Sequence, residues 1–334
     1  MTAGASATLF HPFDAGDLAM PPAGEPVLFL GARPGFHLPR GFDARLVAVQ
    51  GFRPDFLALK GQGVDVTPEP EGSDFSHALV LAGRHRGQNE GWIGQAWQRV
   101  RANGLIIVAG AKEDGIDSLR KRVDQAAGIE GSLSKYHGIA FWLRKTKGAA
   151  APFAPADQVI VDGRFATAPG MFSHERIDQG SRLLAEHLPA NLSGAAADFC
   201  AGWGYLSAEL LAGNPAIVSI ELYEADYASL DAARRNLAGA TVPAGFNWTD
   251  LAAEPVDRRF DVIVMNPPFH RARAAEPDLG RKMIDAAAKA LKPGGQLFMV
   301  AIRGLPYEAD LQRNLKGVRE LARDQSYKVL WGRR

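Results

Sequence analysis

The chain of 334 residues carries the same order of apolar segments twice. Ala78–Leu81 in the first half matches Val262–Met265 in the second, and the next apolar run, Leu105–Ala109, matches Leu297–Ala301. A polar segment of helix length joins the two runs in each half. The repeat predicts one fold used twice, although any two α/β domains can be aligned in this way.

Two segments further upstream keep the same order. Val64–Thr67 matches Phe246–Thr249, and Phe29–Gly35 matches Asp198–Gly204. The separation between matched segments grows along the chain, as loop insertions in the second copy would produce. We therefore interpret the chain as an internal duplication.

The second half alternates short apolar runs with amphipathic segments, which indicates a parallel, doubly wound α/β sheet. Its last two apolar runs, Val318–Leu321 and Tyr327–Trp331, resemble a closing antiparallel pair. The expected strands before them are residues 196–199, 217–223, 246–248, 262–265 and 297–302, with helices from Tyr205 and over 225–237.

The length also favours two domains, at roughly 150 residues each. The segment 148–157 is rich in Ala and Pro and has no apolar period, so we expect it to be a linker. The domains are then residues 1–147 and 158–334. With 46% hydrophobic and 22% charged residues, the chain can bury a core in each of them.

Charge is unevenly distributed along the chain. The formal net charge is only +1, but the stretch 84–150 carries twelve basic and six acidic residues. This basic stretch suits contact with the phosphates of a nucleic acid. A solvated helix face with a basic linker explains the same pattern equally well.

Several classes of protein are disfavoured. No apolar run approaches the roughly 20 residues of a membrane span, and the first ten residues lack the features of a secretory signal. The single cysteine, Cys200, cannot form an internal disulfide, so we expect a reducing cytoplasm. The eight histidines show no metal-ligand spacing, and we expect no metal.

The strongest local motif is Asn266-Pro267-Pro268-Phe269, which directly follows an expected strand. Ligands bind at the carboxyl ends of strands in open α/β sheets. Two prolines hold the chain extended and leave its carbonyls as free acceptors. The Asn266 oxygen and the Pro267 carbonyl can accept both hydrogens of a planar amino group, and Phe269 can stack on a flat base. A rigid turn is the plain alternative.

A second motif, Asp198 to Gly204, joins the first strand of the second half to its helix. Its glycines allow close backbone approach to a ligand. As a dinucleotide fingerprint it fails, because the third glycine is replaced by Ser207. Asp198 suits the ammonium of a methionine-like group, while Glu224 and Asp250, at the next two strand ends, suit ribose hydroxyls and adenine.

Taken in order, these motifs resemble class I S-adenosylmethionine-dependent methyltransferases that modify exocyclic or amide nitrogens. Further segments narrow the resemblance to the ribosomal RNA guanine-N2 methyltransferases, the small-subunit methyltransferase C and large-subunit methyltransferase G families. It covers about residues 165–331. The sequence departs from the family pattern at Cys200, Trp203 and Ile302. The segments that carry the narrower resemblance are Pro169–Ser173, Asp178–Ser181, Asn266–His270 and Leu305–Tyr307.

The resemblance implies two tandem Rossmann-like methyltransferase domains, the first degenerate and serving in RNA binding or structure. In the first copy, Phe29 stands for Asp198, Pro68 for Asp250, and Ala82–His85 for Asn266–Phe269. It also implies S-adenosylmethionine as cofactor. The cofactor would contact Asp198, Ala201, Gly202, Gly204, Glu224, Asp250 and Asn266, and the substrate would contact Pro268, Phe269 and His270.

The expected reaction is methyl transfer to the N2 amine of a guanine in ribosomal RNA, most simply 16S RNA, either free or in a ribosomal subunit. Asn266, Pro267 and Phe269 are the expected catalytic residues, acting on an unpaired or flipped base. We expect a monomer. Alternatives are methylation of adenine N6 or of a protein glutamine, an NAD-dependent oxidoreductase, and a non-catalytic RNA-binding assembly factor.

Overall fold

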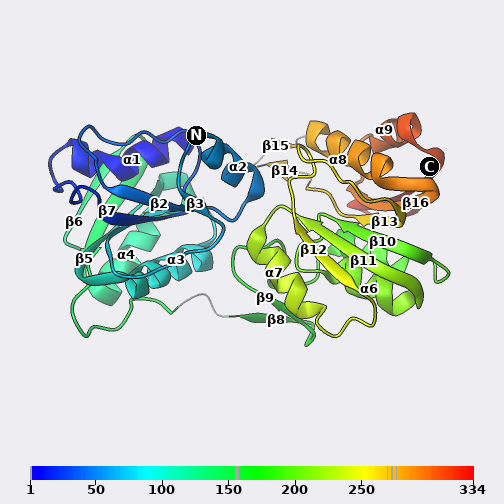
Figure 1. Ribbon diagram of the computed structural model, residues 1–334, viewed down its shortest axis with the longest axis horizontal. Helices are drawn as coiled ribbons and strands as arrows, with labels where there is room; N and C mark the ends of the chain where they lie inside the picture. The colour runs from blue at the N-terminus through cyan, green and yellow to red at the C-terminus, as the bar shows by residue number, and fades with distance from the viewer. Residues whose placement is uncertain (1, 155–157, 269, 272–273, 276) are drawn as a thin grey trace. The chain divides into compact units, whose positions relative to one another are not determined.

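The computed structural model describes residues 2–154, 158–268, 270–271, 274–275 and 277–334 (Figure 1). The chain divides into two compact units. The first contains Met1–Gln158 and Ala168–Gly170, and the second contains Val159–Thr167 and Met171–Arg334. Three residues that follow the expected linker, Ala168–Gly170, thus pack with the first unit.

Each unit is built around one seven-stranded sheet. The first unit has, in chain order, α1 (Thr2–Asp14), β1 (Pro26–Leu30), β2 (Arg45–Val49), α2 (Arg53–Gly61), β3 (Val66–Thr67), β4 (Phe75–Leu81), α3 (Arg86–Arg99), β5 (Val100–Ala111), η1 (Lys112–Asp114), α4 (Ile116–Ala127), β6 (Gly131–Lys135) and β7 (Gly138–Arg144).

The second unit adds two short two-stranded sheets to its main one. Its elements are β8 (Val159–Val161), β9 (Phe165–Thr167), α5 (Gln179–Glu186), β10 (Ser193–Phe199), α6 (Tyr205–Gly213), β11 (Ala216–Glu224), α7 (Tyr227–Asn236), β12 (Ala244–Trp248), β13 (Phe260–Met265), β14 (His270–Arg271), β15 (Ala274–Ala275), α8 (Pro277–Ala290), β16 (Leu291–Ile302), α9 (Tyr307–Asn314), β17 (Lys316–Arg323) and β18 (Tyr327–Arg333).

Strand order confirms the duplication. The two sheets have the strand orders β3-β2-β1-β4-β5-β7-β6 and β12-β11-β10-β13-β16-β18-β17. When the seven strands of each sheet are counted along the chain, both orders are 3-2-1-4-5-7-6. In each sheet five parallel strands are followed by an antiparallel pair, in which β7 or β18 runs opposite to both of its neighbours. The pair in the second unit is the one that the sequence predicted. Every strand expected in the second half is present at its predicted place.

Hydrogen-bond register corrects the alignment of the two copies. Leu30 pairs with Val80, and its counterpart Phe199 pairs with Met265, so Val80 and not Leu81 matches Met265. The shift matters because side chains alternate between the two faces of a strand. Leu81 therefore occupies the place of Asn266, where the sequence alignment put Ala82.

The same comparison corrects a second position and leaves a third unchanged. Val49 pairs with Thr67, and its counterpart Tyr223 pairs with Asn247, so Pro70, not Pro68, occupies the place of Asp250. The match of Phe29 with Asp198 holds. The errors arise where loops of different length precede a strand, because such loops leave the alignment without a fixed point.

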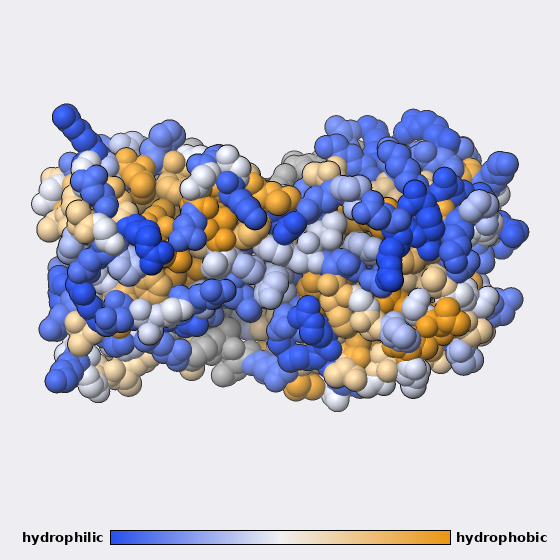
Figure 2. All heavy atoms as spheres, in the orientation of Figure 1, coloured by the Kyte–Doolittle hydropathy of each residue, from blue (hydrophilic) through white to orange (hydrophobic). Residues whose placement is uncertain are grey.

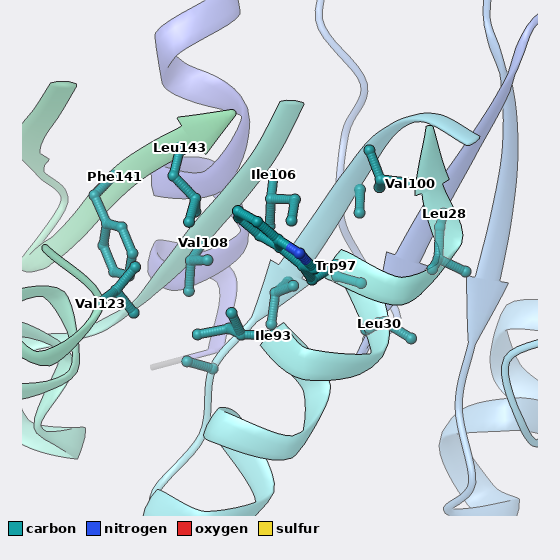
Figure 3. Packing of buried hydrophobic residues seen from close by; sticks show 14 of the residues in the cluster. Leu28, Leu30, Ile93, Trp97, Val100, Ile106, Val108, Val123, Phe141 and Leu143 are labelled. Atoms are coloured by element: carbon teal, nitrogen blue, oxygen red, sulfur yellow. The ribbon is translucent and has the colours of Figure 1, made fainter. Parts of the chain in front are cut away.

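Helices cover both faces of each sheet and bury apolar side chains against it. In the first unit, Ile93 and Trp97 of α3 pack over Leu28, Leu30 and Ile106 of the strands (Figure 3). In the second, α8 turns Met283 and Ile284 to the core while its outer side is hydrophilic (Figure 2). The central parallel strands, such as β4 and β13, are buried on both faces, which explains their continuous apolar runs.

Candidate active site

Three neighbouring strands of the second sheet end side by side. Phe199 of β10 pairs with Tyr223 of β11 and with Met265 of β13, as the adjacent strands in Figure 1 indicate. The loop after Phe199, Glu224 and Asn266 therefore lie at one edge of the sheet. The predicted site residues from these three strands are brought together, as expected for the carboxyl edge of an open α/β sheet.

Asp198 is the residue before the end of β10, and its side chain is fully buried. One carboxyl oxygen, Oδ2, accepts a hydrogen bond of 2.7 Å from the Ser207 hydroxyl. The other, Oδ1, has no hydrogen-bond partner among the described residues. Burial raises the pKa of Asp198 to about 7, with the Ser207 hydrogen bonds opposing the shift. A buried acceptor with a free oxygen suits a cationic or N–H donor ligand.

The loop after Asp198 turns sharply. Cys200 has φ of 61°, in the left-handed region that costs a non-glycine residue roughly 1–2 kcal/mol. Gly202 and Gly204 also have positive φ, of 53° and 88°. Gly204 precedes the first residue of α6, and a side chain there would crowd the Ala233 methyl group at 3.2 Å. The space beside Gly202 is open, with no heavy atom within 4 Å of the place of a Cβ.

Cys200 itself lies against α8. Its Sγ is 3.3 Å from the Met283 Sδ. Burial raises the pKa of the Cys200 thiol, so the group stays protonated at neutral pH. A protonated thiol is a weak nucleophile, which disfavours a nucleophilic role for Cys200.

Glu224, the last residue of β11, is held by two backbone donors. Its Oε2 accepts from Gly202 N at 2.8 Å and its Oε1 from Asp226 N at 2.8 Å. Ala201 N donates to the Tyr223 carbonyl at 3.1 Å, so the loop is tied to β11 by side chain and backbone. Burial also raises the pKa of Glu224 to about 7. Two adjacent carboxyls thus titrate near neutrality, with Glu224 adding to the shift at Asp198.

Asp250 follows β12, the strand next to β11. Its Oδ1 accepts from Ala252 N at 2.9 Å, and its backbone N–H donates to Glu254 Oε2 at 2.8 Å. The side chain is half-buried and structures its own turn. Thr249 N, in the residue before Asp250, donates to the Glu224 carbonyl. Asp250 therefore lies at the end of the strand next to the one that ends in Glu224.

Asn266 is the first residue after β13 and is half-buried. Its Nδ2 donates to Ser181 Oγ at 2.7 Å and to Asp178 Oδ1 at 3.1 Å. Pro267 is buried and Pro268 is exposed. Phe269 lies outside the described residues. His270 begins β14, and its side chain lies outside the described part.

Two residues at this site make contacts that the sequence did not reveal. Ser207 was noted only as a missing glycine, yet its hydroxyl orients Asp198. Trp203, a departure from the family pattern, turns into the core, where its indole N–H donates to the Phe172 carbonyl at 2.9 Å. The i+9 spacing of Ser207 from Asp198 is a signal that a strand–loop–helix model could have used.

Seven of the twelve basic residues in the basic stretch of the first unit form ion pairs among the described residues. Glu90 pairs with both Arg86 and Arg122, and Asp117 with both Arg120 and Lys121. The other ion pairs in or from this stretch are Arg84–Asp114, Arg144–Glu130 and Arg101–Glu25. All but one of these carboxylates belong to the stretch itself, which therefore keeps a net positive charge, and contact with RNA phosphates stays a prediction.

The described residues contain neither a helix that could span a membrane nor a group of side chains that could hold a metal ion. No helix in the described ranges is long and apolar enough to cross a membrane. Within the same ranges, no three His, Cys, Asp or Glu side chains are grouped so that they could hold a metal ion.

Comparison with known proteins places these residues in a family. The model of the methyltransferase small domain matches residues 162–331. A ribosomal RNA small subunit methyltransferase C of Pseudomonas aeruginosa is 31% identical over 242 residues, 69% of this chain and 71% of that protein. One from Shewanella loihica is 32% identical over 268 residues, 77% of this chain and 73% of that protein.

The chain belongs to the ribosomal RNA small subunit methyltransferase C family. A solved member of similar fold is the T. thermophilus 16S rRNA N2 G1207 methyltransferase in complex with AdoMet and guanosine. It superposes with a TM-score of 0.79 at 25% identity, over 98% of this chain and 91% of that one. Membership in a methyltransferase family removes the basis for the oxidoreductase alternative, which the missing third glycine already disfavoured.

Proposed function

We propose that the second unit transfers a methyl group from S-adenosylmethionine to the exocyclic N2 amine of a guanine in small-subunit ribosomal RNA. The observation that carries the proposal is the arrangement of Asn266 and Pro267 at the same sheet edge as Asp198 and Glu224. Amino-group acceptors thus stand beside a loop built for a cationic cofactor. The names of the family relatives, and the AdoMet and guanosine bound to the T. thermophilus enzyme, support it.

The residues present fit S-adenosylmethionine. The free Oδ1 of Asp198 suits its ammonium group, since a buried carboxylate without a partner favours a positive charge. The open space beside Gly202 lets the ligand approach the backbone. Glu224 is fixed where a carboxylate meets ribose hydroxyls, and Asp250 is one strand further along. When bound, the cofactor supplies an electrophilic methyl group with a neutral leaving sulfide.

The chain's own contribution is to orient the attacking nitrogen. An aromatic amine is a weak nucleophile because its lone pair is delocalised into the ring. The Asn266 Oδ1 and the Pro267 carbonyl can accept its two hydrogens, which favours a tetrahedral nitrogen aimed at the methyl group. The amine becomes acidic as it is alkylated, so its proton passes to solvent without a strong base. Phe269 and His270 are proposed to contact the base.

The first unit is proposed to have lost the cofactor site and to serve in structure or RNA contact. Phe29 replaces the carboxylate of Asp198 and is fully buried. Its ring packs at 5.4 Å from that of Phe36 and at 5.9 Å from that of Phe10, which fills the space with aromatic side chains.

The test is nucleoside mass spectrometry of ribosomal RNA from cells lacking this protein. We expect N2-methylguanosine to fall at one position of small-subunit RNA and to be restored in vitro by the purified chain with S-adenosylmethionine. Unchanged N2-methylguanosine would refute the proposal. Loss of N6-methyladenosine instead would identify adenine as the substrate, and loss of methylglutamine, measured by peptide mass spectrometry of the same cells, would identify a protein substrate. Full complementation by Asn266→Ala would favour the non-catalytic assembly factor.

A further inference from the structure

The side-chain amide of Asn266 is hydrogen-bonded to the N-terminal turn of α5, which precedes the Asn-Pro-Pro motif by more than 80 residues in the chain. Asn266 Nδ2 donates to Asp178 Oδ1 at 3.1 Å and to Ser181 Oγ at 2.7 Å. An asparagine NH₂ group has two hydrogens to donate. Both are engaged here, so the nitrogen has nothing left to offer a substrate.

The orientation of the amide follows from the chemistry of its partners. A flipped Asn266 would place its carbonyl oxygen against a carboxylate oxygen of Asp178, where neither atom carries a hydrogen. That arrangement would exchange a charge-assisted hydrogen bond for repulsion. The amide oxygen, Oδ1, therefore points away from α5 and remains an acceptor.

The first turn of α5 is itself rigidly built. Asp178 is the N-cap of the helix, and its Oδ1 also accepts from Ser181 N at 2.9 Å. Gly180 leaves no room for a side chain, because a Cβ there would lie 3.0 Å from the Tyr327 ring. Ser181 is buried. Such packing holds both acceptors in one position, as a precise site requires.

We propose that Asp178 and Ser181 are positioning residues that fix Asn266 as a hydrogen-bond acceptor and so restrict the methyl acceptor to an amino group. The inference rests on the proposed methyl transfer and deepens it. A ring nitrogen without hydrogen or a carbonyl oxygen finds no donor in Asn266. The N2 amine of guanine supplies the two hydrogens that the site can accept, whereas its O6 does not.

Three variants separate this role from helix capping. Ser181→Ala removes one acceptor and leaves the cap. Asp178→Ser keeps an N-cap residue but is too short to reach Asn266. Asp178→Asn retains an acceptor oxygen in the same shape. Gln179→Ala, exposed on the same turn, is the matched control.

Three measurements are made on the full chain. The first is the single-turnover rate of methyl transfer to 16S RNA at saturating S-adenosylmethionine. The second is the Kd of S-adenosylmethionine by calorimetry. The third is solvent exchange of the Asn266 side-chain NH₂ by nitrogen-15 NMR, with the signal assigned by its absence in Asn266→Ala.

We expect Ser181→Ala and Asp178→Ser each to slow methyl transfer about five- to tenfold, the cost of one hydrogen bond. NH₂ exchange should speed up in both, while the Kd stays within about twofold. Asp178→Asn should recover most of the rate, and Gln179→Ala should match the parent. A raised Kd with an unchanged saturated rate would make the two residues cofactor contacts and overturn the proposal.

The NMR arm keeps this inference distinct from the proposed function. If the parent chain methylates no RNA, the proposed function fails, while NH₂ exchange still shows whether α5 holds the amide. If that exchange is fast in the parent and unaltered by Ser181→Ala, the positioning role is wrong whatever the substrate.

Discussion

The two units share a backbone turn at the end of their second strand but differ in the side chain that it holds. In the second unit Glu224 accepts from Asp226 N, two residues on, and from Gly202 N in the loop. In the first unit Gln50 accepts from Phe52 N, again two residues on, and donates to the Ala32 carbonyl. Both side chains stabilise the same turn, although one is an acid and the other an amide. Only Glu224 can supply the negative charge that a cofactor site needs.

The loops after the first strand teach the same lesson through packing. Gly31 has φ of 70°, and its counterpart Cys200 has φ of 61°. The helix after the fourth strand supplies the neighbour in each case, Trp92 in the first unit and Met283 in the second. In the first unit the Trp92 ring packs against Gly31, whereas in the second unit the Met283 thioether packs against Cys200. The first unit thus keeps the turn while filling the space around it.

The largest expected effect comes from giving the second unit the residue that the first has at the same place. Asn266→Leu should lower methyl transfer about 10²–10³-fold, comparable to removing one polar group that stabilises a transition state. S-adenosylmethionine affinity should change little despite the cofactor contact predicted for Asn266, because its nitrogen is engaged by Asp178 and Ser181 and its oxygen is proposed to face the substrate. Single-turnover rates and calorimetry measure the two quantities, and Leu81→Met in the first unit is the control. A rate within about threefold of the parent would contradict the role of Asn266.

The next effect concerns the acid that the first unit lacks. Glu224→Gln should weaken S-adenosylmethionine binding about 10–100-fold, because a charged hydrogen-bond acceptor is replaced by an amide. Binding is measured by calorimetry. The reciprocal Gln50→Glu should leave one cofactor per chain, since Phe29 still fills the first site. Two cofactor molecules per chain would show that this single residue accounts for the difference in cofactor binding between the units.

Stability should distinguish the two loops. In Gly31→Ala the new Cβ would lie 2.6 Å from the Trp92 ring and 2.9 Å from the Leu81 carbonyl oxygen, at a positive φ. We expect a loss of about 2–3 kcal/mol by calorimetric unfolding, with the Kd unchanged. Cys200→Gly should change stability by less than about 1 kcal/mol, because relief of the left-handed backbone offsets the lost contact with Met283. Equal losses would remove the distinction.

The smallest effect is a pH dependence that the second unit contributes through two buried carboxyls. Asp198 and Glu224 have pKa values raised to about 7, above the ordinary value near 4, so the folded protein holds extra protons between these limits. Their contribution to stability is full below about pH 4 and is lost as the pH rises through about 7.

Binding of the cationic cofactor should show the opposite trend, because its ammonium group requires the ionised carboxyl of Asp198. S-adenosylmethionine should bind up to about tenfold more tightly at pH 8 than at pH 6, with proton release detected by calorimetry in buffers of different ionisation enthalpy. Asp198→Asn should flatten the curve. A Kd independent of pH in the parent would contradict the raised pKa values.

Much of the second unit was predictable because its strands are buried on both faces and read as apolar runs. Asn266 and Glu224 were found as polar residues that directly follow such runs. The partners of Asn266 were harder to find, because Asp178 and Ser181 lie more than 80 residues before it in the chain. Register in the first unit was misjudged by one residue at β4 and at β5 and by two at β3, because nothing local fixes where a strand begins to pair.

The sequence by itself determined the duplication, the succession of strands along the second copy and the family, because apolar periodicity and motif order survive without knowledge of contacts. Only the tertiary structure decided that Asp198 keeps a free buried oxygen and that the Asn266 nitrogen is fully engaged. Both depend on which atoms burial brings within hydrogen-bond distance. Residues far apart in the chain set that distance, and no local pattern records it.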